Sequence, residues 1–306
     1  MKILIVGLGS IGKKHVDAIM SLYPFAEIFA LRSCKASEPY KQVINIYSKE
    51  EIPDKLTFVV IATITSEHEV VIHEMMELNC PLFIEKPVLS ELINAVEISG
   101  QLQQRSIVSY VACNLRFHPS LQFVKDYLDK HQPRINEVNI YCGSYLPDWR
   151  PNQNYRTNYS AHADRGGGAH LDLIHEIDYC TWLFGFPDKA LSVKTNTSSL
   201  TISAVDQARF IYSYPLFTVG ITLNYFRRDA KRQLEIITDT DTLMVDLLTN
   251  TVQTVLDGKI LFHEKLNMLD TYKSQIKYFF DCIQSNIQPM NDFNYSVKVL
   301  KLAINE

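Results

Sequence analysis

The stretch Gly7-Leu8-Gly9-Ser10-Ile11-Gly12 decides the fold of this chain. An apolar run typical of a strand precedes it (2–6), and a helical pattern follows (11–21). In a G-x-G-x-x-G turn the first glycine allows a tight turn and the second lets the backbone approach a pyrophosphate. The third lets the helix pack closely on the sheet. Because strand and helix flank the turn as this motif requires, the sequence predicts a dinucleotide site that includes Gly7, Gly9, Ser10, Ile11 and Gly12.

The N-terminal part of the chain alternates short apolar runs with helical patterns. We expect further strands at 26–31, 43–47, 58–63, 82–85 and 107–113, and helices at 67–78 and 91–103. Strands that alternate with helices at this spacing form a parallel sheet covered on both faces. The prediction is an α/β, doubly wound Rossmann domain over residues 1–118.

After Pro119 the pattern changes to consecutive strands joined by short turns. Such strands indicate a large, mostly antiparallel sheet in a C-terminal α+β domain, 119–306. We expect strands at 137–144, 191–195, 208–214, 218–225, 233–238, 243–248 and 251–256, and helices at 121–129, from Gly166-Gly167-Gly168 to about 184, 270–283 and 295–304.

The composition is that of a globular protein outside the membrane. Hydrophobic residues make up 46% and charged residues 21% of the 306 residues, and the formal net charge is -4, without a basic block. This charge argues against nucleic acid or a membrane surface as the main partner. The 6 cysteines are scattered without a C-x-x-C pair, and no secretory signal is readable, so we expect free thiols in a reducing cytoplasm.

The end of the second expected strand bears on the choice of cofactor. An acid at this place binds the ribose hydroxyls of NAD, whereas an arginine suits the 2′-phosphate of NADP. Here Arg32 and Ser33 follow the strand, and Glu27 lies at its other end. NADP is therefore favoured. NAD remains the alternative, because an arginine can also stack on adenine or simply lie in solvent.

Three segments follow strands at the edge of the parallel sheet where ligands bind. They are Thr63 to His68, Glu85-Lys86-Pro87 and Asn114 to Pro119. Together with the glycine turn, the Glu85-Lys86-Pro87 tripeptide and the Arg116-Phe117-His118-Pro119 run resemble the Gfo/Idh/MocA family (glucose–fructose oxidoreductase, inositol dehydrogenase and rhizopine catabolism). The later Gly166-Gly167-Gly168 with Asp172 and His175 fits the same family, so the resemblance spans nearly the whole chain.

The resemblance implies a Rossmann domain and an open-sheet domain through which members often form homo-dimers or homo-tetramers. It also implies that Lys86 lies beside the nicotinamide and the substrate hydroxyl, and that Pro87 follows a cis peptide. A lysine there can polarise a developing oxyanion; the alternative is a surface lysine that closes a strand. Further cofactor contacts are expected from Thr63, His68, Glu85, Pro87 and Asn114.

Asp172 and His175 are three residues apart and would share one face of a helix. An imidazole is a natural acid/base for a hydroxyl proton, and a neighbouring carboxylate can orient it. Many family members place the histidine four residues after the aspartate, where this chain has Glu176. The alternatives are a packed histidine bonded to Asp172, or a metal site with His162, Asp164 and His170; the family chemistry needs no metal, and none is expected.

An aromatic and arginine-rich segment follows the first strand of the second domain. Aromatic rings suit the faces of a sugar, and arginines suit carboxylates or phosphates. A nucleotide-linked or acidic amino sugar is consistent with it, although the segment could instead pack on the sheet or on another subunit. The expected substrate residues are Arg116, Trp149, Arg150, Tyr155 and Arg156.

The leading hypothesis is an NAD(P)-dependent oxidoreductase that transfers hydride between nicotinamide and a secondary alcohol or ketone of a sugar, polyol or nucleotide-linked sugar. Lys86 and His175 are expected to converge over the reactive ring. Two alternatives remain open: a non-catalytic regulator that senses the dinucleotide, and a redox-neutral enzyme that uses the cofactor transiently.

Overall fold

The computed structural model describes residues 1–35 and 38–305, which form two compact units. The first unit comprises residues 1–114 and 268–298, and the second comprises 115–267 with the end of the chain from residue 299. Each unit is built on its own sheet, and each is described separately below.

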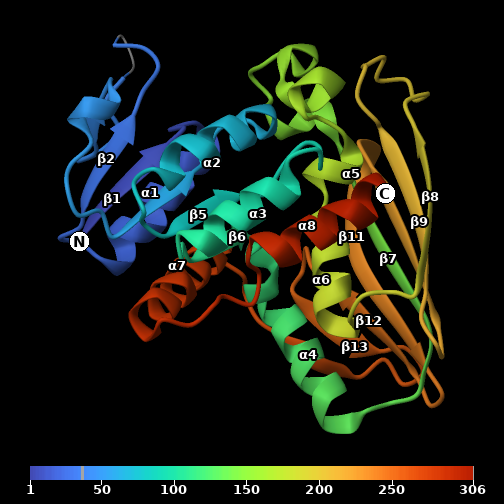
Figure 1. Cartoon of the computed structure of the whole chain (residues 1–306). Helices are drawn as coiled ribbons and strands as arrows, with labels where there is room; N and C mark the ends of the chain where they lie inside the picture. The colour runs from blue at the N-terminus through green and yellow to red at the C-terminus, as the bar shows by residue number, and fades with distance from the viewer. Residues whose placement is uncertain (36–37, 306) are drawn as a thin grey trace. The chain divides into compact units, whose positions relative to one another are not determined.

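The first unit contains a six-stranded, wholly parallel sheet in the order β3-β2-β1-β4-β5-β6 (Figure 1). The strand order reverses between β1 and β4, and doubly wound folds bind dinucleotides at such a switch point. The strands are β1 (Lys2–Val6), β2 (Glu27–Leu31), β3 (Ile44–Ile46), β4 (Phe58–Ile61), β5 (Leu82–Glu85) and β6 (Ser109–Ala112). The helices of residues 1–114 are α1 (Ser10–Leu22), α2 (His68–Met76) and α3 (Ala95–Gln104), with short 3-10 helices η1 (Lys49–Glu51) and η2 (Thr65–Glu67).

A helix from the far end of the sequence completes the first unit. α7 (Met268–Ser285) packs against α1, and the ring of Phe279 lies against Phe58, Phe83 and Tyr110. The sequence pattern placed everything after residue 118 in the second domain, whereas residues 268–298 return to the first unit. The reason is hydrophobic: the buried face of α7 covers apolar side chains of the parallel sheet.

The second unit contains an eight-stranded sheet in the order β14-β13-β12-β11-β7-β10-β9-β8. All neighbouring strands are antiparallel except β7 and β10, so the predicted mostly antiparallel sheet is confirmed. The strands are β7 (Ile135–Tyr145), β8 (Lys189–Thr195), β9 (Gln207–Ser213), β10 (Thr218–Asn224), β11 (Phe226–Thr238), β12 (Thr242–Asp246), β13 (Thr251–Thr254) and β14 (Ile260–His263).

Within the described residues, helices of this unit pack on one face of this sheet. α5 packs on β9 and β10, and α6 packs on β7. Side chains of β9 accordingly alternate between the buried Phe210 and Tyr212 and the exposed Arg209 and Ile211. The other elements outside the first 114 residues and α7 are α4 (Pro119–His131), α5 (Ala169–Asp172), α6 (His175–Phe184), α8 (Phe293–Ile304, shared by both units), η3 (Asn114–Phe117), η4 (Leu146–Trp149), η5 (Tyr155–Thr157), η6 (Tyr159–Ala161) and η7 (Ala163–Arg165).

Two local expectations are wrong. The helix expected from the glycine triplet to residue 184 is interrupted at Leu173 and Ile174, which separate α5 from α6. β14 is an additional edge strand that the sequence analysis did not contain. Elsewhere the thiols agree with expectation, since all cysteines are free and five of the six are buried. Within residues 1–35 and 38–305, no helix has the length and apolarity needed to cross a membrane.

Candidate active site

The glycine turn of the first unit has the geometry that a dinucleotide needs. Gly7 has a φ of 93°, and a Cβ there would lie 2.5 Å from the Ala62 carbonyl oxygen. A Cβ on Gly12 would lie 2.2 Å from the Gly7 carbonyl oxygen, whereas a Cβ on Gly9 would meet nothing within 4 Å. The first and third glycines are therefore needed for packing, and the second borders open space at the start of α1, where free N–H groups attract an anion.

A buried hydroxyl lies next to this turn. Thr63 follows β4, its backbone nitrogen lies near Gly7, and its Oγ1 has no hydrogen-bond partner among the described residues. Buried polar groups normally have a partner, so a missing one points to a ligand or water. The open space at Gly9 and this hydroxyl fit a dinucleotide whose phosphates lie at the N-terminus of α1.

Arg32 follows β2 directly, at the carboxyl end of the sheet. Its backbone N–H donates to the Ile46 carbonyl over 2.9 Å, and its Nη1 donates to Asn45 Oδ1 over 3.3 Å. Its side chain is half-buried, and Ser33 beside it is exposed. Both residues lie where an adenosine ribose sits in this class of fold.

The peptide bond between Lys86 and Pro87 is cis, as expected. His68 lies under this turn: its Nδ1 is 2.9 Å from the Pro87 carbonyl oxygen, and its Nε2 is 3.3 Å from that of Thr63. Burial lowers the pKa of His68. The ring lies between the turns after β4 and β5, and a neutral imidazole, which has a single N–H, can donate to one of these two carbonyls at a time. Of the other expected contacts, Asn114 donates from Nδ2 to Thr271 Oγ1 over 2.8 Å.

The second unit brings two tyrosines to Asp172, the last residue of α5. The Tyr159 hydroxyl donates to Oδ1 over 3.0 Å, and the Tyr225 hydroxyl donates to Oδ2 over 2.5 Å. Burial and the negative charge of Asp172 raise the pKa of both phenols, so both stay protonated and donate. We call Asp172, Tyr159 and Tyr225 the Asp172 cluster. Tyr225 was missed by the sequence analysis, because nothing local distinguishes it at the end of a strand pattern.

Two of the predicted substrate residues lie beside the Asp172 cluster. The Trp149 ring stands edge-on to Tyr225, with the centroids 5.2 Å apart, and its Nε1 donates to Ser144 Oγ over 2.8 Å. The Arg150 guanidinium lies over the Tyr159 ring, 5.9 Å from its centroid. The aromatic segment thus reaches the carboxylate that the sequence analysis singled out.

Tyr155 and Arg156 lie in a different part of the same segment. The Tyr155 hydroxyl donates to the Leu200 carbonyl over 2.9 Å, which fastens the segment to the loop before β9. The exposed Arg156 lies over the Tyr155 ring, 5.0 Å from its centroid. Neither contact involves the Asp172 cluster.

Arg116 does not have the environment of a substrate residue. Its guanidinium is buried, and its Nε and Nη2 donate to Asp178 Oδ2 and Oδ1 over 2.9 and 2.7 Å. A bidentate buried pair of this kind occupies the fork of the guanidinium. The substrate role expected for Arg116 is therefore not supported, and we assign it to the packing of α6.

His175 is half-buried at the first position of α6, and the break at Leu173 and Ile174 separates it from Asp172. Glu176, which stands where many family members have histidine, is fully buried and accepts from Arg232 Nε and Nη2 over 2.6 and 3.0 Å. The ion pair between Glu176 and Arg232 therefore connects α6 to β11. Among the described residues, no group of three or more acidic, histidine or cysteine side chains could hold a metal ion.

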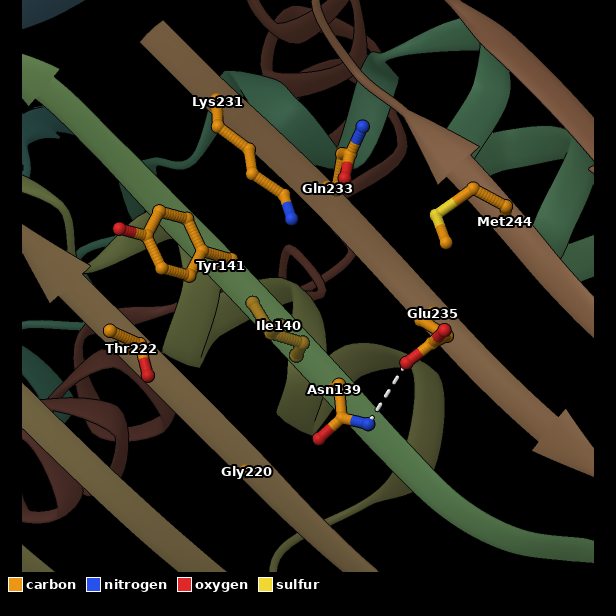
Figure 2. A pocket seen from close by; sticks show the side chains of 9 residues that line it. All are labelled: Asn139, Ile140, Tyr141, Gly220, Thr222, Lys231, Gln233, Glu235 and Met244. Carbon is orange, nitrogen blue, oxygen red and sulfur yellow. Dashed lines mark hydrogen bonds between the residues drawn. The ribbon is translucent and has the colours of Figure 1, made fainter. Parts of the chain in front are cut away.

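The outer face of the sheet, opposite α5 and α6, carries a polar hollow (Figure 2). Figure 2 shows the Lys231 and Glu235 side chains on β11 at either side of Gln233, with Asn139 Nδ2 donating to Glu235 over 3.0 Å. Gly220 and Thr222 of β10 border it. The paired strand β9 continues this face with Ile211 opposite Gly220.

Comparison with known proteins agrees with this geometry. Residues 1–112 match the family GFO_IDH_MocA, described as the oxidoreductase family with an NAD-binding Rossmann fold. Over these N-terminal residues the resemblance to the Gfo/Idh/MocA oxidoreductases seen in the sequence is confirmed.

Among curated relatives, inositol 2-dehydrogenase/D-chiro-inositol 3-dehydrogenase from Lacticaseibacillus casei is 24% identical over 194 residues. This match covers 60% of the chain and 53% of the relative, so it extends over about half of the relative's length.

Two solved structures match over the full chain. UDP-N-acetylglucosamine 3-dehydrogenase GnnA from Acidithiobacillus ferrooxidans has a TM-score of 0.80 at 18% identity, covering 100% of this chain and 96% of that one. The WlbA dehydrogenase from Bordetella pertussis, in complex with NADH and UDP-GlcNAcA, has a TM-score of 0.83 at 17% identity, covering 100% and 94%. At such identity the likeness shows the fold alone, and it confirms the α/β architecture with its two sheets.

Proposed function

We propose that this protein is an NAD(P)-dependent oxidoreductase that transfers hydride between nicotinamide and a secondary alcohol or ketone of a sugar-like substrate. The observation that carries the proposal is the open space at Gly9 beside the unpartnered Thr63 hydroxyl, at the switch point of a parallel sheet. A bound dinucleotide supplies the hydride acceptor or donor of this chemistry.

Alcohol oxidation breaks a C–H bond, whose electron pair leaves as hydride, and an O–H bond, whose proton needs a base. In the proposal the His175 imidazole takes that proton, since imidazole titrates near neutral pH. The Lys86 ammonium lies against the same oxygen and stabilises its negative charge as the proton leaves. In the reverse direction His175 returns the proton.

Asp172 is the third residue of the proposed mechanism, after His175 and Lys86. Its carboxylate already accepts from Tyr159 and Tyr225, so both oxygens are engaged by protonated phenols. We assign it the part of a fixed negative charge that orients the His175 ring and stabilises the imidazolium. The two tyrosines keep this buried carboxylate in one position.

The side chains beside the Asp172 cluster favour a sugar with an anionic group. Trp149 offers a ring face for a pyranose, and Arg150 offers a cation for a carboxylate or a phosphate. We propose a nucleotide-linked or acidic amino sugar. The names of GnnA and of the WlbA complex, which refer to UDP-linked sugars, support this substrate class.

For the cofactor we propose a preference for NADP, with NAD as the alternative. Arg32 and Ser33 follow β2, and neither is an acid that would select the free ribose hydroxyls. Arg32→Ala should lower kcat/KM with NADP about 10-fold or more and leave that with NAD within about threefold. Equal losses with both cofactors would contradict the preference.

The decisive experiment measures cofactor absorbance with NADP or NAD and a panel of polyols and nucleotide sugars. Lys86→Ala and His175→Ala should lower kcat by orders of magnitude while dinucleotide affinity stays nearly unchanged. The exposed Lys130→Ala and His131→Ala on α4 are matched controls that should keep full activity. Undiminished turnover of Lys86→Ala and His175→Ala would defeat the assignment. A wild-type protein that binds dinucleotide but converts none of the panel would favour a dinucleotide sensor. Conversion of a substrate without net formation or consumption of NAD(P)H would favour a redox-neutral enzyme.

We also propose that the protein forms a homo-dimer or homo-tetramer through the outer face of the eight-stranded sheet. We propose a cytoplasmic location as well. Leu191 and Ile211 are paired neighbours on this face and are 67% and 55% exposed, and Ile211 lies opposite Gly220, which borders the hollow. Exposed apolar side chains beside a polar hollow are typical of interfaces. Light scattering should show Leu191→Asp/Ile211→Asp as a smaller species than wild type; an unchanged mass would contradict this interface. The free cysteines fit a reducing compartment.

A further inference from the structure

A chain of two hydrogen bonds joins α1 to the backbone of Lys86. His15 lies on α1 with its side chain fully buried, and its Nε2 is 2.6 Å from Oε1 of Glu85 at the end of β5. Oε2 of the same carboxylate accepts the backbone N–H of Lys86 over 3.1 Å. The helix that follows the glycine turn is thus connected to the peptide group that carries the Lys86 side chain.

The His15 ring is fixed by its neighbours. Phe83 and Tyr272 contact it edge-on, with centroid distances of 5.0 and 5.5 Å. An ionised carboxylate only accepts hydrogen bonds, so the ring proton that faces Glu85 lies on Nε2. The Nε2–H therefore points at a single oxygen of the carboxylate.

Glu85 has an anionic carboxylate despite its burial. Burial by itself would raise the pKa of Glu85, but the hydrogen bond and charge of His15, together with the charge of Lys86, bring it below its usual value. A charged acceptor binds an N–H more strongly than a neutral one. The hydrogen bond from the Lys86 backbone N–H to Glu85 is therefore strong as long as His15 donates to the same carboxylate.

We propose that His15 is a positioning residue, which acts through Glu85 to fix the peptide group of Lys86 and so the origin of its side chain. The inference rests on the proposed role of Lys86 in hydride transfer. A displacement of about 1 Å at a reacting group can lower a rate about 100-fold. His15 thereby also connects the helix of the dinucleotide turn to the lysine that serves the same reaction.

The test compares His15→Leu, which removes the donor, with His15→Gln, whose side-chain amide can still donate to Glu85. His15→Leu should lower kcat about 10- to 100-fold, with the KM for substrate and the affinity for dinucleotide within about threefold. His15→Gln should recover most of kcat. Glu85→Gln should likewise lower kcat while the KM and the dinucleotide affinity change little. The double variant His15→Leu/Glu85→Gln should have a kcat no lower than that of the slower single variant, because both residues act through the same chain of hydrogen bonds.

A second readout needs neither cofactor nor substrate. Hydrogen exchange of the Lys86 amide in the free protein should be about 10-fold faster in His15→Leu than in wild type, and near wild type in His15→Gln. Unchanged exchange would overturn the inference, as would equal kcat in the leucine and glutamine variants. Full activity of Lys86→Ala would instead defeat the proposed function, so the two failures are distinguishable.

Discussion

The hydroxyl of Tyr225 donates to Oδ2 of Asp172 over 2.5 Å, although 53 residues separate the two in the sequence. Tyr225 directly follows β10 in the eight-stranded sheet, and Asp172 ends α5, which packs on that strand. The carboxylate is therefore positioned by the sheet and not only by its own helix.

Removal of this donor should destabilise the protein and slow catalysis. Tyr225→Phe leaves one oxygen of a buried carboxylate with one donor fewer, so we expect the free energy of unfolding to fall by about 1.5–3 kcal/mol and kcat to fall at least about 10-fold. Urea denaturation and steady-state kinetics measure the two effects. Tyr212→Phe is a matched control, because the Tyr212 hydroxyl is equally buried and has no hydrogen-bond partner among the described residues. A loss as large in the control would attribute the effect to packing alone.

Gly9 and Gly12 of the dinucleotide turn should respond differently to alanine. Gly9→Ala adds a methyl group in open space, so the free energy of unfolding should stay within about 0.5 kcal/mol while dinucleotide affinity falls about 10-fold or more. Gly12→Ala places a methyl group against the Gly7 carbonyl and should cost about 2 kcal/mol or more in stability. Thermal unfolding and fluorescence titration with NADPH measure both quantities. Equal stability of the two variants would contradict the packing role of Gly12.

The sequence predicts those parts of the fold that depend on local pattern. The strands of the parallel sheet are short apolar runs between polar residues, and their expected centres agree with β1 to β6. The break at Leu173 and Ile174 is not predictable in this way, because the pattern from Ala169 to Phe184 is helical throughout. The break directly follows Asp172, whose carboxylate accepts hydrogen bonds from Tyr159 and Tyr225 in other parts of the chain.

The same distinction applies to the site. The glycine turn, the Lys86-Pro87 peptide and Asp172 are found from motifs, which are local in sequence. The partners of these residues are not: His15 and Glu85 are 70 positions apart, and Arg232 meets Glu176 across 56. The return of α7 to the parallel sheet likewise depends on a surface that no local pattern describes.

His118 should make the stability of the protein depend on pH. Its side chain is buried, its Nε2 donates to the Leu247 carbonyl over 3.1 Å, and burial lowers its pKa to about 4. Between about pH 6.5 and 4 the unfolded chain takes up a proton that the folded one does not. The free energy of unfolding therefore decreases as the pH is lowered through this range, by up to about 3 kcal/mol. Urea denaturation from pH 7.5 to 4.5 should show a shallower fall in His118→Gln. His170, whose pKa is also lowered to about 4 by burial, keeps its own contribution in that variant; curves of equal slope would refute the role of His118.

The buried pair of Arg116 and Asp178 should act on stability rather than on substrate binding. Arg116→Met leaves the Asp178 carboxylate buried without its bidentate partner, so we expect a loss of about 3–5 kcal/mol in the free energy of unfolding. Because replacement of both partners removes the uncompensated charge, Arg116→Met/Asp178→Leu should recover most of that loss. The KM for substrate of the double variant should stay within about threefold of wild type. A double variant that is stable but has a KM raised at least about 10-fold would restore Arg116 to the substrate site that the sequence pattern suggested.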